Sequence, residues 1–166
     1  MRILANFLVI VVIVVAGCND NAKQLAGPET TERPEIEKMK LLTLQGEPVD
    51  LTKYKGKAVF INFWATWCKP CVEEMPTIKN AIANLKDADI EFMFASDEKT
   101  EEIEAFEREH NFGFTYLKAS DIQDYGILAL PTTMIFDKEG KKIFSELGYR
   151  KWDDKENLDR LLQASK

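Results

Sequence analysis

Two cysteines three residues apart, Cys68 and Cys71, have the types and spacing to do chemistry. If a helix begins between them, the unpaired backbone N–H groups of its first turn and its dipole favour a thiolate. A thiolate beside a second thiol supports thiol–disulfide exchange. Metal binding is the competing interpretation of this spacing. Structural zinc needs four ligands, and apart from Cys18 the chain adds only His110, so no metal site is expected.

The flanking sequence indicates the elements that must position this pair. Residues 58–64 are apolar and rich in β-branched and aromatic side chains, which is typical of a buried strand. Residues 72–85 repeat apolar side chains at helical spacing. The pair therefore lies at a strand-to-helix junction. Cys68, nearer the helix start and solvent, is expected to be the attacking thiolate, and Cys71 the thiol that resolves the mixed disulfide.

Neighbours of the pair are expected to assist it. Lys69 adds positive charge, which should lower the pKa of Cys68, and Pro70 restricts the turn. Trp67 offers an apolar surface to a partner, with a packing tryptophan as the alternative. Trp64 is interpreted as structural.

Residues 63–76, FWATWCKPCVEEMP, resemble the active-site signature of the membrane-anchored thioredoxin-like proteins of the TlpA/ResA type. The resemblance continues at 125–127 and 130–133 and ends at 135–140, so it covers the chain from about Met39 onward. It implies a thioredoxin-like α/β fold. This fold has a central mixed β-sheet flanked by helices, an N-terminal β-hairpin and a central strand–helix insertion.

The resemblance also implies roles for residues outside the pair. In this fold the proline at Pro131 is cis and faces the cysteines across a groove, and Leu130 helps to set partner choice. Classical thioredoxins carry a titrating aspartate where this chain has Asn62. TlpA/ResA-type proteins carry a glutamate at the place of Glu74, on the helix face of Cys71. If buried, its pKa should rise, as suits a general acid or base. The alternatives are a trans proline and a solvated carboxylate.

The sequence of the N-terminus indicates a targeting segment. Residues 1–17 are expected to be a lipoprotein signal peptide, because Arg2 precedes an apolar run too short to span a membrane comfortably. Residues 15–18, VAGC, resemble the bacterial lipobox, so Cys18 is expected to be lipidated and to anchor the protein to a membrane. A plain cleaved signal and an uncleaved anchor are the alternatives.

Residues 18–37 are polar, contain glycine and prolines, and are expected to form a flexible tether.

Residues 38–166 are expected to form the thioredoxin-like domain, with helices on both faces of its sheet. His110 is expected to be a cap or surface residue. The other elements expected are a hairpin over 41–51, strands over 90–95, 132–136 and 141–147, a helix from 100, a helical turn over 121–125, and a last helix capped by Asp153 or Asp154 that buries Leu158, Leu161 and Leu162.

The composition limits the possible partners. The chain has 166 residues, enough for one domain and a tail, and its 45% hydrophobic and 30% charged residues are ordinary for a globular domain. A net charge of −6 without a Lys/Arg cluster makes nucleic acid a poor partner.

The favoured function is that of an extracytoplasmic, lipid-tethered thiol–disulfide oxidoreductase. Its redox group is the disulfide Cys68–Cys71, with no other cofactor. The resemblance suggests a reductase of proteins with cysteine pairs, re-reduced by a membrane electron donor. Cytochrome c maturation and general disulfide repair are the tasks it suggests. A monomer is the default expectation.

Other functions stay open from sequence. A disulfide oxidase or isomerase uses the same residues. A redox-silent lipoprotein that binds a partner is supported by Asn62 in place of an acid. A copper-handling module would need a longer cysteine spacing and a suitably placed histidine, which this chain lacks. Peroxidase activity fits paired cysteines less well than disulfide exchange does.

Overall fold

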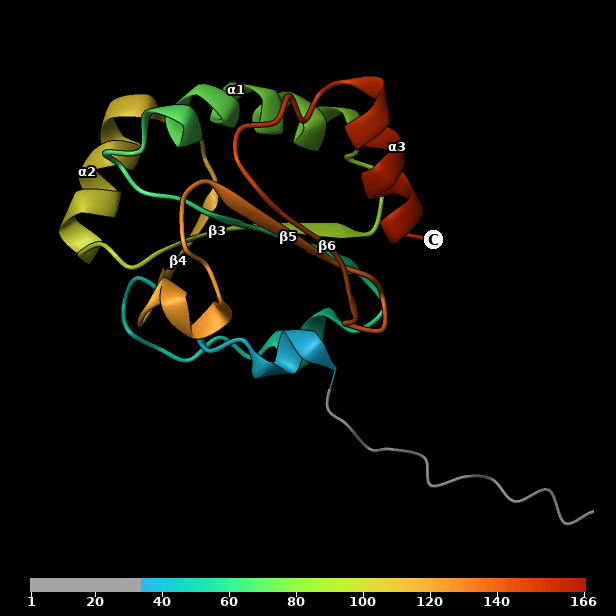
Figure 1. Ribbon diagram of the computed structural model, residues 1–166, viewed down its shortest axis with the longest axis horizontal. Coiled ribbons are helices and arrows are strands. Elements are labelled where there is room, and N and C mark those ends of the chain that lie inside the picture. Colours follow the sequence, from blue (N-terminus) through green and yellow to red (C-terminus); the bar gives the residue numbers. More distant parts are fainter. Residues whose placement is uncertain (1–33) are drawn as a thin grey trace, which may run out of the picture. The chain divides into compact units, whose positions relative to one another are not determined.

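Strand β2 (Ala58–Phe63) is central in the computed structural model, which describes residues 34–166. All six of its residues are buried, as the unbroken apolar run indicates. It pairs in parallel with β3 (Ile90–Ser96) and antiparallel with β5 (Thr132–Phe136) (Figure 1). The described sheet has the order β1-β4-β3-β2-β5-β6. Its remaining strands are β1 (Leu41–Leu42), β4 (Thr115–Ala119) and β6 (Lys142–Leu147).

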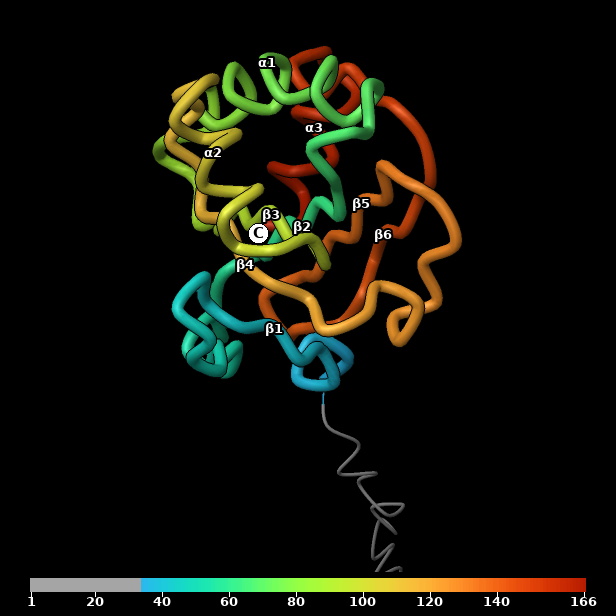
Figure 2. Tube along the Cα trace, turned by 90° about the vertical axis from the view of Figure 1, so that its left-hand side faces the viewer, coloured from blue at the N-terminus to red at the C-terminus, as the bar shows by residue number. Residues whose placement is uncertain are grey.

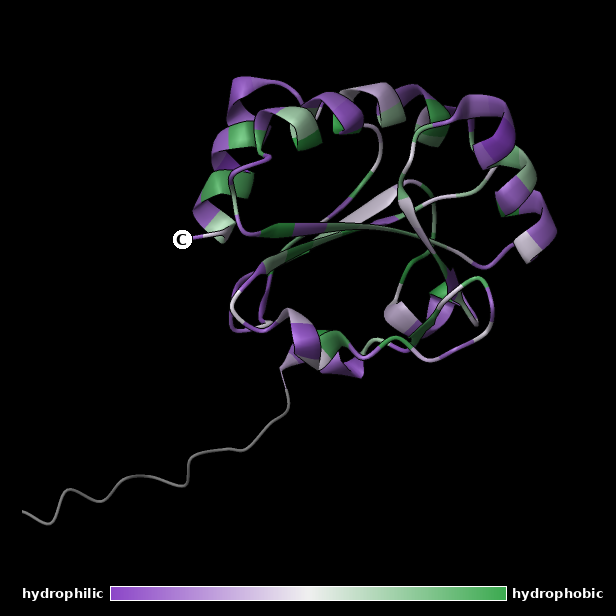
Figure 3. Ribbon diagram, turned by 180° about the vertical axis from the view of Figure 1, so that it is seen from behind, coloured by the Kyte–Doolittle hydropathy of each residue, from purple (hydrophilic) through white to green (hydrophobic). Residues whose placement is uncertain are grey.

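The strand directions confirm the expected mixed sheet. Strands β2, β3 and β4 run parallel, and β1, β5 and β6 each run antiparallel to a neighbour. Side chains alternate across β2, so Phe60 and Trp64 enter one core cluster while Val59, Ile61 and Phe63 enter another. In Figure 3 the hydrophobic colour accordingly follows the central strands, whereas the helices carry both colours.

The two faces of the sheet are covered differently. Helices α1 (Lys69–Asn84), α2 (Thr100–His110) and α3 (Lys155–Ala164) all contribute to the core cluster that contains Phe60 and Trp64. Figures 1 and 2 show the three helices together on one side of the sheet. The other face is covered by short 3-10 helices, η1 (Glu35–Lys38), η2 (Leu51–Tyr54) and η3 (Ile122–Tyr125). Helices therefore lie on both faces as expected, but every α-helix of residues 34–166 packs on the same one.

The expected N-terminal hairpin is only partly formed. Its first arm is β1, which pairs with β4, and Leu42 forms a single antiparallel bridge with Pro48. The return arm then stops, because the Asp50 side chain accepts a hydrogen bond from the Thr52 N–H at 3.0 Å and starts η2. The expectation of a second short strand over 49–51 was wrong.

The fold begins earlier than the expected boundary at residue 38. Ile36 is buried, and its N–H donates to the carbonyl oxygen of Gly140 at 3.0 Å. Gly140 has φ +76°, and a Cβ there would lie 2.5 Å from Cγ2 of Ile36. A glycine is therefore needed both for the turn between β5 and β6 and for the close approach of this segment. Residues 34–37 belong to the domain and not to the tether.

The remaining elements agree closely with expectation. The strands, the helix from Thr100 and the turn before Gly126 all form, and the expected cap of the last helix is Asp154, which accepts from the Asn157 N–H at 2.9 Å. Leu161 is buried, but Leu162 is exposed, so the expected stripe was one residue too wide. Within residues 34–166, no helix has the length and apolar character needed to cross a membrane. The expected signal peptide and Cys18 lie outside the described residues.

Candidate active site

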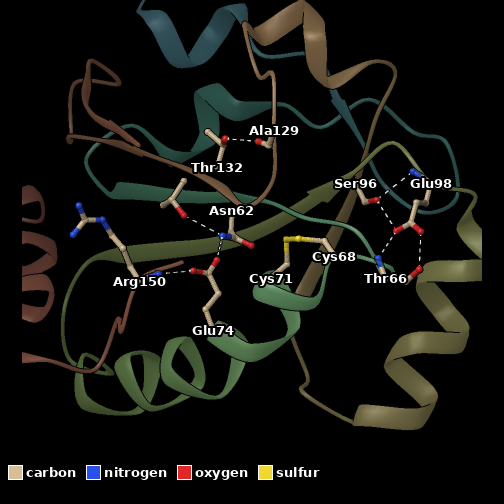
Figure 4. The surroundings of a disulfide bond; sticks show 11 residues. Asn62, Thr66, Cys68, Cys71, Glu74, Ser96, Glu98, Ala129, Thr132 and Arg150 are labelled. Atoms are coloured by element: carbon tan, nitrogen blue, oxygen red, sulfur yellow. Dashed lines mark hydrogen bonds between the residues drawn. A yellow bond between two sulfur atoms is a disulfide. The ribbon is translucent and has the colours of Figure 1, made fainter. Parts of the chain in front are cut away.

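Cys68 and Cys71 form a disulfide at the point where β2 leads into α1 (Figure 4). Cys68 is the N-cap of α1, and its carbonyl accepts the Val72 N–H at 3.1 Å. Pro70 lies in the first turn, where its missing N–H costs no helical hydrogen bond. Cys68 is 4% exposed and Cys71 is 0% exposed, so Cys68 is the one nearer to solvent, as the sequence indicated.

The segment before β5 passes opposite the disulfide. The Leu130–Pro131 peptide bond is cis, as the family resemblance implied. Thr132 pairs with Phe63 at the end of β2, and its hydroxyl donates to the Ala129 carbonyl at 2.8 Å. Figure 4 shows Ala129 and Thr132 across from the sulfur atoms. Leu130 is half-buried against both core clusters.

Several segments at this end of the sheet carry exposed apolar side chains. Trp67 is 73% exposed, so the alternative of a packing tryptophan was wrong, whereas Trp64 is fully buried. Leu147 pairs with Thr132, and the N–H of Gly148 donates to the Pro131 carbonyl at 2.8 Å. The ends of β2 and β6 and the start of β5 therefore share one edge. The large apolar side chains exposed there, called the apolar rim below, are Trp67, Leu128, Leu147 and Tyr149.

Glu74 is fully buried on α1, three residues after Cys71. Its Oε1 accepts from Asn62 Nδ2 at 2.7 Å, and its Oε2 accepts from the Arg150 N–H at 3.0 Å. Burial raises the pKa of this carboxyl from the ordinary 4.5 to about 7, although these two hydrogen bonds oppose the rise. The expectation of a buried carboxyl with a raised pKa was correct. Asn62 also donates to Thr133 Oγ1 at 3.0 Å.

Glu98 is a second carboxylate near the disulfide, and no role was expected for it from the sequence. Its Oε2 accepts from the Thr66 N–H at 2.7 Å and its Oε1 from the Thr66 hydroxyl at 2.6 Å. The Ser96 hydroxyl donates to Glu98 Oε2 at 3.2 Å. Glu98 thereby holds the loop that leads to Cys68. One signal was present, because parallel strands such as β2 and β3 end at the same edge of a sheet.

Two other residues take the places expected of them. The Lys69 side chain is 86% exposed and lies 3.7 Å from Glu73, so its effect on Cys68 stays a prediction. His110 ends α2 and stacks on Phe106 with a ring-centroid distance of 4.0 Å. Among residues 34–166, no three His, Cys, Asp or Glu side chains are grouped as metal ligands would be.

These features define a class of protein. A dithiol pair on the first turn of a helix, opposite a cis-proline at the edge of a mixed sheet, is a thioredoxin-fold disulfide centre. Residues 33–143 match the family described as AhpC/TSA. A thiol–disulfide oxidoreductase ResA from Bacillus thuringiensis is 34% identical over 72% of this chain and 70% of its own length. The thioredoxin-like protein YneN from Bacillus subtilis is 36% identical over 82% of this chain and 84% of its own.

A solved structure agrees in fold. The thiol:disulfide interchange protein of the thioredoxin family from Chlorobium tepidum has a TM-score of 0.63 at 23% identity, over 80% of this chain and 97% of that one. The chain belongs to the AhpC/TSA family of the thioredoxin superfamily and, within it, to the ResA-like thiol–disulfide oxidoreductases. It is an enzyme of the class that exchanges thiols and disulfides.

Proposed function

We propose that this protein is a lipid-anchored reductase of protein disulfides outside the cytoplasm. The observation that carries the proposal is the Cys68–Cys71 disulfide on the first turn of α1, with the buried acid Glu74 three residues after Cys71 on the same helix. A buried carboxyl with a pKa of about 7 exchanges protons near neutral pH, as the resolving step requires. The apolar rim offers a surface for a polypeptide.

The reaction moves two electrons from the reduced pair to a substrate disulfide. The Cys68 thiolate attacks one substrate sulfur, the substrate S–S bond breaks, and one substrate thiolate leaves and is protonated. The thiol of Cys71 then loses its proton and attacks the Cys68 sulfur, which releases the second substrate thiolate. The enzyme is left with the disulfide described above, and a dithiol donor at the membrane returns two electrons and two protons to it.

Glu74 is the group assigned to the proton of Cys71. It lies on the same face of α1, one turn further on, and it is buried where water cannot readily serve instead. With a pKa of about 7, about half of the population holds the proton at neutral pH. The carboxyl is therefore suited both to accept the proton before resolution and to return one on re-reduction.

The apolar rim is the surface proposed for the substrate. Trp67 directly precedes Cys68, and Leu130 precedes the cis-proline. An extended substrate beside Pro131 would place its cysteine near Cys68. The proposed substrates are proteins with cysteine pairs. The haem-attachment sequence Cys-x-x-Cys-His is the candidate substrate for cytochrome c maturation, and general disulfide repair is the broader alternative.

The reduction potential tests the direction. Equilibration with glutathione, read by the mass shift on alkylation, should give a value near that of thioredoxin, about −270 mV. A value near about −120 mV would make the protein an oxidant, which is the alternative function. Insulin reduction by dithiothreitol, with a Cys68→Ser control, tests turnover separately.

A matched pair of peptides tests the substrate. An oxidised Cys-x-x-Cys-His peptide and a peptide of the same composition with the cysteines far apart should be offered to the reduced enzyme. Faster reduction of the first supports the role in cytochrome c maturation, and equal rates support general repair.

Anchoring through Cys18 is a separate proposal. It rests on the lipobox-like sequence VAGC at 15–18. The chain expressed in a bacterium should appear in the membrane fraction with acyl chains on Cys18 by mass spectrometry. A Cys18→Ser chain should lose both. An unmodified Cys18 would overturn this part and leave the redox chemistry untouched.

A further inference from the structure

The carboxamide of Asn62 has one half of its hydrogen-bonding capacity unused. Asn62 is fully buried, and its Nδ2 donates to Glu74 and to Thr133. The ionised form of Glu74 accepts hydrogen bonds only, so in that form the amide nitrogen is the atom that faces the carboxylate, as the 2.7 Å bond from Asn62 Nδ2 to Glu74 Oε1 has it. The oxygen Oδ1 is then left buried with no hydrogen-bond partner. Buried polar atoms without partners are rare and costly, so this atom calls for an explanation.

The oxygen faces the disulfide. Along β2, Phe60, Asn62 and Trp64 point to the same face, and Phe60 and Trp64 share a core cluster with Cys71. In Figure 4 the Asn62 oxygen lies on the side of the amide toward Cys71, while the nitrogen turns to Glu74. A disulfide sulfur carries no hydrogen and offers nothing to this oxygen. A thiol has one S–H donor.

We propose that Asn62 positions the resolving thiol, with Oδ1 accepting a hydrogen bond from the Cys71 S–H when the pair is reduced. Reduction by a dithiol breaks the S–S bond, places two electrons on the two sulfurs and leaves one proton on Cys71. The proton therefore lies between Cys71 and an amide whose other end is bonded to Glu74. This role follows from thiol–disulfide exchange itself and is independent of the direction assigned under the proposed function.

The arrangement has a thermodynamic consequence. The oxidised form keeps an unpaired oxygen, and the reduced form satisfies it, so Asn62 stabilises the dithiol relative to the disulfide. Replacing Asn62 with leucine removes both effects, and both changes favour the disulfide. The equilibrium constant for disulfide formation should increase about tenfold, which makes the potential about 30 mV more negative.

The test isolates the thiol of Cys71 in the full chain. In a Cys18→Ser, Cys68→Ala chain, Cys71 is the remaining thiol, so the infrared S–H stretching band belongs to it alone. The band should lie below that of a thiol in an apolar solvent, as a hydrogen-bonded S–H does. Adding Asn62→Leu should move it up to the free-thiol position. A band already at the free-thiol position with Asn62 intact overturns the proposal, whether or not the leucine variant folds.

Thr133→Val provides the matched control. It removes the other acceptor of the Asn62 amide and keeps the shape of a buried side chain, but it leaves Oδ1 untouched. The S–H band should stay where it is, and the glutathione equilibrium of the Cys18→Ser chain should change less than twofold. Equal shifts in the Thr133→Val and Asn62→Leu chains would mean that general packing is responsible, and the proposal would fail. Neither readout depends on a substrate, so either can fail while the reductase assignment stands.

Discussion

Two glutamates lie on opposite sides of one disulfide, and their surroundings give them different work. Glu74 is on the inner side, fully buried on α1 and bonded to a side-chain amide and a backbone N–H. Glu98 is on the outer side, half-buried in the loop after β3, where the backbone N–H and hydroxyl of Thr66 both donate to it. Figure 4 shows the two networks separated by Cys68 and Cys71.

The difference shows how position decides what a carboxyl does. On the inner side, loss of water outweighs the hydrogen bonds and raises the pKa of Glu74 to about 7, which suits proton exchange. On the outer side, Glu98 uses both oxygens to hold Thr66 in place, so its contribution is the geometry of the loop before Cys68. Glu74 is therefore suited to proton transfer, and Glu98 to holding the loop in position.

The pH dependence of stability is the largest expected sign of the inner side. Because the pKa of Glu74 is raised when folded, the folded chain binds more protons than the unfolded chain between pH 4.5 and about 7. The free energy of unfolding should fall by about 3 kcal/mol as the pH rises through this window. Urea unfolding at several pH values should show this slope, and Glu74→Gln should remove it. Identical profiles for the two chains would contradict the burial argument.

The rate at which Cys71 resolves the mixed disulfide should fall about 100-fold at neutral pH when Glu74 is replaced by glutamine. This is the usual scale of general acid–base catalysis. The reduced enzyme reacts with an aromatic disulfide, and release of the second aromatic thiolate reports the attack by Cys71. Glu74→Gln should slow this second release and leave the first unchanged. Glu73→Gln is the matched control, because that side chain is 56% exposed on the same helix. An equal loss in both variants would remove the special role of the buried acid.

Glu98 and Thr66, on the outer side, should affect the free energy of unfolding and not the proton transfer. Glu98→Gln replaces one acceptor oxygen with a donor, so the free energy of unfolding should fall by about 1–2 kcal/mol. Thr66→Val removes the hydroxyl bond and should cost about 1 kcal/mol. The double variant should lose less than the sum, because the two residues share one interaction. Strict additivity in urea unfolding would show that Glu98 does not hold Thr66.

The exposed pair of Lys69 and Glu73 should matter least. Lys69→Ala should change the free energy of unfolding by no more than about 0.5 kcal/mol, because surface ion pairs are screened by water. The pH profile of Cys68 alkylation in the same variant measures the predicted effect of the lysine on the thiolate. A loss in the free energy of unfolding above about 1 kcal/mol would show that Lys69 contributes to the stability of the fold.

Much of the fold around the disulfide, and part of the candidate site, could be predicted from local sequence. The apolar run of β2 and the helical repeat after it placed Cys68 and Cys71 at a strand-to-helix junction, because side-chain periodicity is a local property. Helical spacing put Glu74 on the face of Cys71 for the same reason. The cis bond at Pro131 came from a family resemblance and was not contained in local propensity.

Other features depended on contacts between distant residues. The docking of Ile36 on Gly140 and the grouping of the described α-helices on one face follow from tertiary packing. The role of Glu98 could not be predicted from the sequence around it. Its loop meets Thr66 only because β2 and β3 pair in the sheet.

The sequence by itself determined the redox pair, the strand and helix that hold it, and the acid one turn away, since each is fixed by spacing along one segment. Only the tertiary structure decided the surroundings of these groups. The pKa of Glu74 and the unpaired oxygen of Asn62 depend on which distant atoms exclude water from them, whereas the apolar rim depends on which segments meet at one edge of the sheet. Desolvation is a property of the assembled core, and no single stretch of the chain contains it.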